Sequence, residues 1–123
     1  MGKTILVIDD DAMNLKRAEF ILTKAGYGVL TAASGREGIE RLKRGTADLT
    51  LLDIEMPGMN GIQTLEQIRG DASLCGSRVM ALTASDDGEM RRRMEELGAV
   101  GYIKKPFMPP ALQRQVEEAL EHV

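Results

Sequence analysis

The sequence predicts an α/β domain built on one doubly wound parallel sheet of five strands, with five helices on both faces. Short apolar runs typical of buried strands alternate with segments whose apolar residues recur at helical spacing. The connections between these segments are short, and we find no internal repeat, linker or low-complexity stretch. Because the alternation extends over all 123 residues, we expect a single domain at 1–123.

The first unit is a strand followed by a helix. Residues 4–8 form a β-branched apolar run that stops at three successive acids, 9–11. Apolar residues then recur at helical spacing from Leu15 to Ala25. Gly26 is the expected C-cap, because glycine tolerates the left-handed backbone that ends many helices.

The second unit repeats this order in a shorter form. A strand is expected at 28–32. Ser34 and Glu37 then have the Ser-x-x-Glu spacing of a capping box, in which each side chain accepts a hydrogen bond from the other residue's amide. The spacing predicts a helix from this point to about residue 44.

The third strand is the element around which the chain is organised. Residues 49–52 carry no charge, as expected of a strand that is covered on both faces in a parallel sheet, and the run ends at Asp53. Pro57 and Gly58 then break the chain, because proline lacks an amide hydrogen and glycine permits a sharp turn. A helix is expected over 62–70.

The fourth unit again joins a strand to a helix. The strand at 78–82 finishes at Thr83. An Asp-Asp-Gly-Glu sequence at 86–89 has an acid with Glu three residues on, which favours an N-cap. The apolar side of the helix extends to Leu97, and Gly98 is expected to end the helix.

The fifth strand is expected at 100–103 and leads into Lys104, Lys105 and Pro106. The last helix follows the proline pair 109–110, since proline is tolerated in the first turn of a helix. Five alternating units predict a parallel sheet with right-handed crossovers. Of the two common doubly wound strand orders, the flavodoxin-like order 2-1-3-4-5 fits five units.

Composition excludes several classes of protein. Hydrophobic residues make up 43% and charged residues 28%, which is globular and not disordered. A net charge of −3 gives no non-specific attraction to nucleic acid or to an anionic membrane. We see no apolar run of membrane-spanning length and no signal sequence before the first strand. A single cysteine, Cys75, cannot form an internal disulfide, so a cytoplasmic location is expected.

Polar residues scattered over nearly the full chain stand where the predicted strands end. They are Asp9, Asp10, Asp53, Thr83 and Lys105. The carboxyl ends of parallel strands meet at one edge of the sheet, which is where open α/β sheets bind their ligands. Three neighbouring carboxylates repel one another and cannot all stay ionised without a cation. Oxygen ligands of this kind predict Mg²⁺, with Mn²⁺ as a substitute.

Asp53 stands apart from the other two acids and is placed to act as a nucleophile. A carboxylate that attacks phosphorus forms an acyl phosphate. The metal ion and the Lys105 ammonium would stabilise the charge of the transferred phosphoryl oxygens. A hydroxyl at Thr83 could donate a hydrogen bond to the attached phosphoryl group and so sense the modified state.

Four stretches carry a resemblance to a known family. They are 5–11 (ILVIDDD), 48–61 (DLTLLDIEMPGMNG), 82–84 (LTA) and 101–107 (GYIKKPF). Taken together, the sequence resembles the receiver domain of two-component response regulators, and the likeness covers the whole chain. The resemblance implies the CheY-like version of the predicted fold and a role in signal transduction as a phosphoprotein.

The resemblance also implies a role for each residue of the site. Asp53 would be the phosphoacceptor, and Asp9 and Asp10 would be the acidic pair that holds magnesium. Asp53 itself and the backbone carbonyl of Glu55 would be further ligands. Lys105, directly before the proline, matches the family lysine.

Switching would follow from two further residues. Thr83 would move toward the phosphoryl group, and the switch aromatic Tyr102 would then turn inward and alter the surface of helix 4, strand 5 and helix 5. The implied donor is a histidine kinase or histidine phosphotransfer protein, and the output is an effector, an output domain or a phosphorylation-dependent dimer. Direct binding to nucleic acid or membrane is not expected. The domain would be no enzyme, apart from catalysing its own phosphorylation and dephosphorylation.

Two other classes of function stay open on the sequence alone. Asp9 and Asp11 form an Asp-x-Asp at the end of the first strand, which would make Asp9 the nucleophile of a small haloacid-dehalogenase-like phosphatase. Against this, Met13 stands where that motif has Thr or Val, and no acidic pair follows a strand after Lys105. Asp11 is expected to be a helix-entry residue and not a metal ligand. The other alternative is a non-catalytic α/β interaction module, which would not respond to magnesium and acetyl phosphate.

Overall fold

The computed structural model describes residues 2–45 and 47–121, which form five strands and five helices in alternation. The strands are β1 (Thr4–Ile8), β2 (Gly28–Ala32), β3 (Leu49–Asp53), β4 (Val79–Thr83) and β5 (Tyr102–Lys104). The helices are α1 (Ala12–Lys24), α2 (Gly35–Arg44), α3 (Gly61–Gly70), α4 (Gly88–Glu96) and α5 (Pro109–Glu121). Within the described residues, none of these helices has the length and apolarity needed to cross a bilayer.

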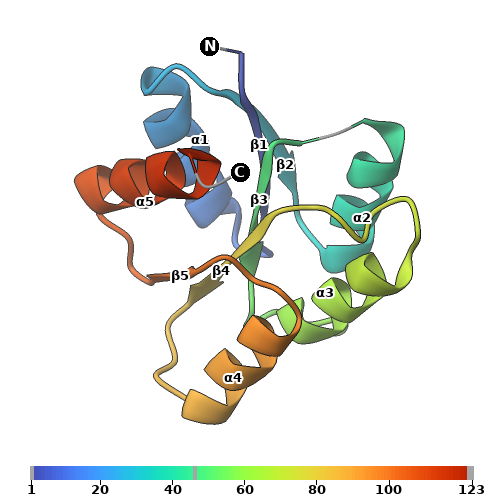
Figure 1. The fold of residues 1–123 in the computed structure, drawn as a ribbon. Coiled ribbons are helices and arrows are strands. Elements are labelled where there is room, and N and C mark those ends of the chain that lie inside the picture. The colour runs from blue at the N-terminus through green and yellow to red at the C-terminus, as the bar shows by residue number, and fades with distance from the viewer. Residues whose placement is uncertain (1, 46, 122–123) are drawn as a thin grey trace.

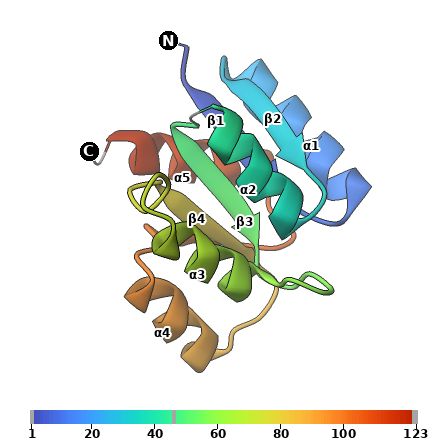
Figure 2. The ribbon, with the colours of Figure 1, turned by 90° about the vertical axis from the view of Figure 1, so that its right-hand side faces the viewer.

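The five strands form one parallel sheet in the order β2-β1-β3-β4-β5. Helices α1 and α5 cover one face, and α2, α3 and α4 cover the other (Figure 1). Successive strand residues point to opposite faces, so β1 contributes Val7 to the apolar cluster under α1 and α5 and Leu6 to the cluster under the other helices. Figure 2 shows α2 and α3 side by side over the second face. The predicted doubly wound architecture is confirmed.

The register of β1 against β3 determines what meets at the carboxyl edge of the sheet. Ile8, the last residue of β1, lies opposite Leu52. Asp9 follows directly after β1, and Asp53 is the last residue of β3. The two acids therefore leave neighbouring strands at the same level.

The turn from β3 into α3 is held close to Asp53 by a glycine. A Cβ atom at Gly61 would lie 2.5 Å from the backbone oxygen of Asp53 and 2.6 Å from the Cα of Ile54, so no other residue fits there without moving the backbone. Asn60 and Gln63 cap the helix start by exchanging side-chain and backbone hydrogen bonds. The start of α3 thus fixes the backbone position of Asp53.

Several predicted boundaries differ from the structure. The C-cap of α1 is Ala25, and Gly26 follows it with a positive φ of 98°. Strand β4 begins one residue later than predicted, at Val79. The fifth strand begins at Tyr102, because Val100 and Gly101 only approach β4 through single backbone hydrogen bonds before regular pairing starts. The N-cap of α4 is Asp87, whose carboxylate accepts hydrogen bonds from the amides at the helix start. Asp86 does not cap the helix, because its carboxylate instead pairs with Lys104 on β5.

Candidate functional site at the carboxyl edge

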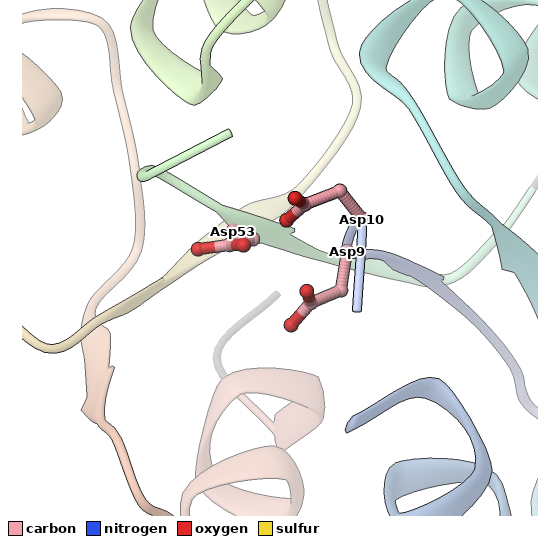
Figure 3. A group of neighbouring side chains, drawn as sticks. All are labelled: Asp9, Asp10 and Asp53. Carbon is pink, nitrogen blue, oxygen red and sulfur yellow. The ribbon is translucent and has the colours of Figure 1, made fainter. Parts of the chain in front are cut away.

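The structure brings Asp9, Asp10 and Asp53 together at the ends of β1 and β3 (Figure 3). One carboxylate oxygen of each residue lies within 4.8 Å of the others. Asp9 and Asp53 are buried, with 0% and 1% of their surface exposed, whereas Asp10 is exposed. Acids separated by more than 40 positions in the sequence therefore form one cluster, which is exposed to solvent at Asp10.

The carboxylate of Asp9 is held by three neighbours. The backbone amide of Asp11 donates to Oδ1 at 2.9 Å, and the Asn14 side-chain amide donates to Oδ2 at 3.3 Å. The ammonium of Lys105 lies 3.5 Å from Oδ2. Asp11 also caps α1 by accepting from the amide of Met13, as predicted for a helix-entry residue. The contact of Asn14 was not predicted, although its place in the first turn of α1 is compatible with it.

Asp53 accepts from two donors through one oxygen. The Nζ of Lys105 lies 2.9 Å from Asp53 Oδ1, and the backbone amide of Glu55 donates to the same oxygen at 3.1 Å. Burial raises the pKa of the Asp53 carboxyl to about 7, against the lowering effect of Lys105. The negative charge of Asp9 raises this pKa further.

Lys105 carries the only positive charge in contact with this cluster among the described residues. Burial works to lower the pKa of Lys105, but its hydrogen bond to Asp53 and the charges of Asp53 and Asp9 outweigh that effect, and the pKa is raised. One ammonium beside three carboxylates leaves an excess of negative charge. An all-oxygen cluster with this imbalance fits a hard divalent cation such as Mg²⁺ or Mn²⁺.

Thr83 ends β4 next to this cluster, but its hydroxyl is already engaged. It donates to Oε2 of Glu55 at 2.6 Å and accepts from the amide of Ser85 at 3.0 Å. The other carboxylate oxygen of Glu55, Oε1, accepts from the amide of Ala84 at 3.0 Å. The sequence predicts that the backbone carbonyl of Glu55 is a metal ligand and that Glu55 and Ser85, beside the site, influence the lifetime of the acyl phosphate. No local sequence pattern connects the Glu55 side chain to β4.

Tyr102 on β5 packs against α4. Its hydroxyl donates to Oε1 of Glu95 at 2.6 Å, and the guanidinium of Arg91 lies 4.7 Å from the ring centroid. The hydrogen bond to Glu95 is the main reason that the pKa of Tyr102 is raised, with burial adding to it. Asp86 connects the same region by pairing with Lys104 and, at 3.9 Å, with Arg91.

A family model described as "Response regulator receiver domain" matches residues 5–117. The chain belongs to this family. The chemotaxis protein CheY of Thermotoga maritima is 36% identical over 125 residues, covering 100% of this chain and 98% of that protein. The alkaline phosphatase synthesis transcriptional regulatory protein PhoP of Bacillus subtilis is 32% identical over 120 residues, covering 98% of this chain and 49% of that protein.

Solved structures of receivers have the same fold. Vibrio cholerae CheY4 superposes with a TM-score of 0.91 at 27% identity, covering 97% of this chain and 99% of that chain. The CheY-like receiver domain protein of Methanospirillum hungatei superposes with a TM-score of 0.90 at 31% identity, covering 98% and 95%. The prediction of a CheY-like receiver is confirmed, and the phosphatase alternative is set aside.

The share of each relative's length that this chain spans differs from one relative to another. The chain spans about half the length of several curated relatives, 49% of PhoP and 50% of the probable C4-dicarboxylate response regulator DctR of Priestia megaterium. By contrast, it spans 98% of Thermotoga CheY. A receiver of this kind therefore occurs both as most of a protein and as one part of a longer regulator.

Proposed function

We propose that this receiver accepts a phosphoryl group on Asp53 from the phosphohistidine of a histidine kinase or histidine phosphotransfer protein. The observation that carries the proposal is the buried Asp53 carboxylate at the strand ends, with Lys105 2.9 Å away and two further acids beside it. Membership in the receiver family gives the class of donor. In the transfer, an Asp53 oxygen forms a bond to phosphorus while the phosphorus–nitrogen bond breaks, and its electron pair stays on the partner's imidazole.

The contacts of Asp53 suit this role. Lys105 and the Glu55 amide both contact Oδ1, and no donor contacts Oδ2 within the described residues, so Oδ2 is the oxygen that could take part in bond formation or in cation binding. Lys105 can follow the developing negative charge from the carboxylate to the phosphoryl oxygens, because its ammonium already lies between Asp53 and Asp9. Burial keeps competing water away from the carboxylate.

Asp9, Asp10, Asp53 and the backbone carbonyl of Glu55 are the proposed ligands of Mg²⁺, for which Mn²⁺ could substitute. When bound, the ion would offset the repulsion among the acids and the incoming phosphoryl oxygens. This accounts for a site in which three carboxylates face a single ammonium. The domain would thereby catalyse its own phosphorylation and dephosphorylation.

Phosphorylation is proposed to shift a two-state equilibrium of the α4–β5–α5 surface through Thr83 and Tyr102. Tyr102 is bound to Glu95 on α4, so a rearrangement of Thr83 and β4 would alter how α4 is held. The output would be an effector, an attached output domain or a dimer formed through this surface. A cytoplasmic location and the absence of direct binding to nucleic acid or membrane remain predictions.

Transfer from radiolabelled phosphorylated histidine kinases tests this function. We expect the wild-type protein to acquire hydroxylamine-sensitive label with at least one kinase of a panel, and a metal chelator to prevent it. Asp53→Asn should abolish labelling. Asp11→Asn is the matched control, because asparagine caps a helix as well as aspartate does, and it should label like wild type. Label retained by Asp53→Asn, or mapped to another residue, would contradict the proposal.

A further inference from the structure

The carboxylate of Glu55 occupies two hydrogen-bond donors beside the acceptor site. Its Oε2 accepts from the hydroxyl of Thr83 at 2.6 Å, and its Oε1 accepts from the amide of Ala84 at 3.0 Å. An anion therefore already binds two consecutive donors at the end of β4. Thr83 is the residue expected to donate to the phosphoryl group on Asp53, and Ala84 follows it directly in the chain.

We propose that Glu55 is an internal competitor of the phosphoryl group: its carboxylate holds Thr83 and Ala84 in the unphosphorylated protein and must leave before they can bind phosphoryl oxygens. This inference rests on the proposed phosphorylation of Asp53. It makes Glu55 a positioning residue that acts through Thr83, and it gives the side chain a role separate from the proposed use of its backbone carbonyl as a metal ligand.

Hydrogen-bond capacity makes the competition exclusive. A threonine hydroxyl has one proton to donate, and that proton is directed to Glu55, while the oxygen accepts from the amide of Ser85. The amide of Ala84 likewise has one hydrogen, and it is also directed to Glu55. Neither the Thr83 hydroxyl nor the Ala84 amide can donate a full hydrogen bond to a phosphoryl oxygen until the Glu55 carboxylate moves.

Charge and exposure favour displacement of the Glu55 side chain over an arrangement in which the carboxylate and the phosphoryl group share the two donors. A carboxylate and a phosphoryl group are both anions and repel each other when they share the same donors. Glu55 is exposed, so its carboxylate can swing into water, where it is well solvated. Its backbone stays in place through the amide that donates to Asp53 Oδ1. The exchange therefore needs side-chain rotation and leaves the loop where it is.

The competition should lower the apparent affinity for a phosphoryl group, because only the fraction of molecules with free donors can bind it in full. Charge-assisted hydrogen bonds of this kind correspond to a change of roughly tenfold in an equilibrium constant. Beryllofluoride, a stable analogue of the phosphoryl group, is the appropriate probe. We expect Glu55→Ala to bind it about tenfold more tightly than wild type at saturating magnesium. Glu55→Gln, which keeps a neutral acceptor oxygen, should have a smaller effect.

Two controls separate competition from a general change in charge. Glu89→Gln removes the charge of another exposed acid, in the first turn of α4, and should leave the beryllofluoride affinity within about twofold of wild type. In a Thr83→Ala background, the gain from Glu55→Ala should shrink, because one of the two contested donors is already absent. Equal gains from Glu55→Gln and Glu89→Gln would overturn the inference.

The amide resonance of Ala84 reports the contact directly and without any analogue. Removal of the carboxylate should shift the Ala84 amide proton upfield in Glu55→Ala. With beryllofluoride bound, the Ala84 amide protons of wild type and Glu55→Ala should have similar chemical shifts. An Ala84 resonance that is unchanged in Glu55→Ala, or beryllofluoride affinities that agree within about twofold, would overturn the competition while leaving the proposed function intact. A wild-type protein that binds no beryllofluoride would instead overturn the proposed function, and this inference with it.

Discussion

The carboxyl edge of the sheet has two sides that are built differently. The side proposed to accept the phosphoryl group, here the acceptor side, consists of Asp9, Asp10, Asp53 and Lys105, where two buried acids and one exposed acid face a single ammonium. The side proposed to switch, here the switch side, is the region around α4, where exposed groups of opposite charge pair with one another. The acceptor side therefore has unbalanced charge in a buried place, and the switch side has balanced charge near water.

The two helices next to this edge show the same contrast. Helix α3 buries four residues, whereas α4 buries only Met94. Met90 and Leu97 pack against the core while only partly buried, and α4 also forms exposed ion pairs, such as Arg93 with Glu66 at 2.7 Å. Exposed ion pairs are each worth at most about 1 kcal/mol. A phosphoryl group on the acceptor side could thus rearrange α4 without breaking the apolar core.

The largest expected effect concerns the acceptor side and pH. Burial raises the pKa of Asp53 to about 7 from its ordinary 3.8, so the folded metal-free protein binds this proton more tightly than the unfolded chain does. The contribution of the protonated Asp53 carboxyl to the free energy of unfolding is fully present below the ordinary pKa and is lost as pH rises through 7. With chelator present, Asp53→Asn should exceed wild type in free energy of unfolding by up to about 4 kcal/mol at pH 8 and by little at pH 4.

Urea unfolding at a series of pH values measures this difference between the two proteins. Saturating magnesium should reduce it, because a cation bound by the acids of the cluster stabilises the ionised form in wild type. A difference that is the same at both ends of the pH range would show that Asp53 is not kept protonated by its surroundings.

A smaller effect is expected on the switch side from Arg69 of α3. Its guanidinium donates to the carbonyls of Leu97 at 2.6 Å and Gly98 at 3.3 Å, at the end of α4, and also to the loop before β4. Arg69→Ala should lower the free energy of unfolding by about 1–3 kcal/mol. Amide hydrogen exchange should accelerate more in α4 than in α3. Arg92→Ala is the control, since this exposed arginine makes no side-chain hydrogen bond or ion pair in the described part of the chain, and its effect should stay within about 0.5 kcal/mol.

The smallest effect is expected from Glu95→Gln. The hydrogen bond from Tyr102 to the ionised Glu95 is the main cause of the raised pKa of Tyr102, so loss of the charge should lower that pKa. Stability should change by less than about 1 kcal/mol. Ultraviolet titration in a Tyr27→Phe background isolates Tyr102, because the protein has two tyrosines. An unchanged pKa would mean that the contact does not persist in solution.

The position of the acids could be predicted from the sequence, whereas the side-chain contacts of Glu55 and Arg69 could not. Apolar runs locate the strands, and parallel order brings their ends together, so Asp9 and Asp53 could be assigned to one edge without coordinates. The Glu55–Thr83 contact joins residues 28 positions apart, on a loop and a strand end. Arg69 looks like any surface arginine of a helix. Contacts among exposed side chains contribute little free energy each and leave no periodic pattern.

The pairing of β1 with β3 has a further consequence for how such a site can vary. Because hydrogen bonds between strands set the level of Ile8 against Leu52, the distance between the two neighbouring acids does not depend on the loops that connect the elements. Extra residues in the connection before β3 would leave this spacing intact, whereas one residue inserted within β1 would turn Asp9 toward the opposite face. The surfaces that meet partners can therefore diverge among relatives while the chemistry at the strand ends is preserved.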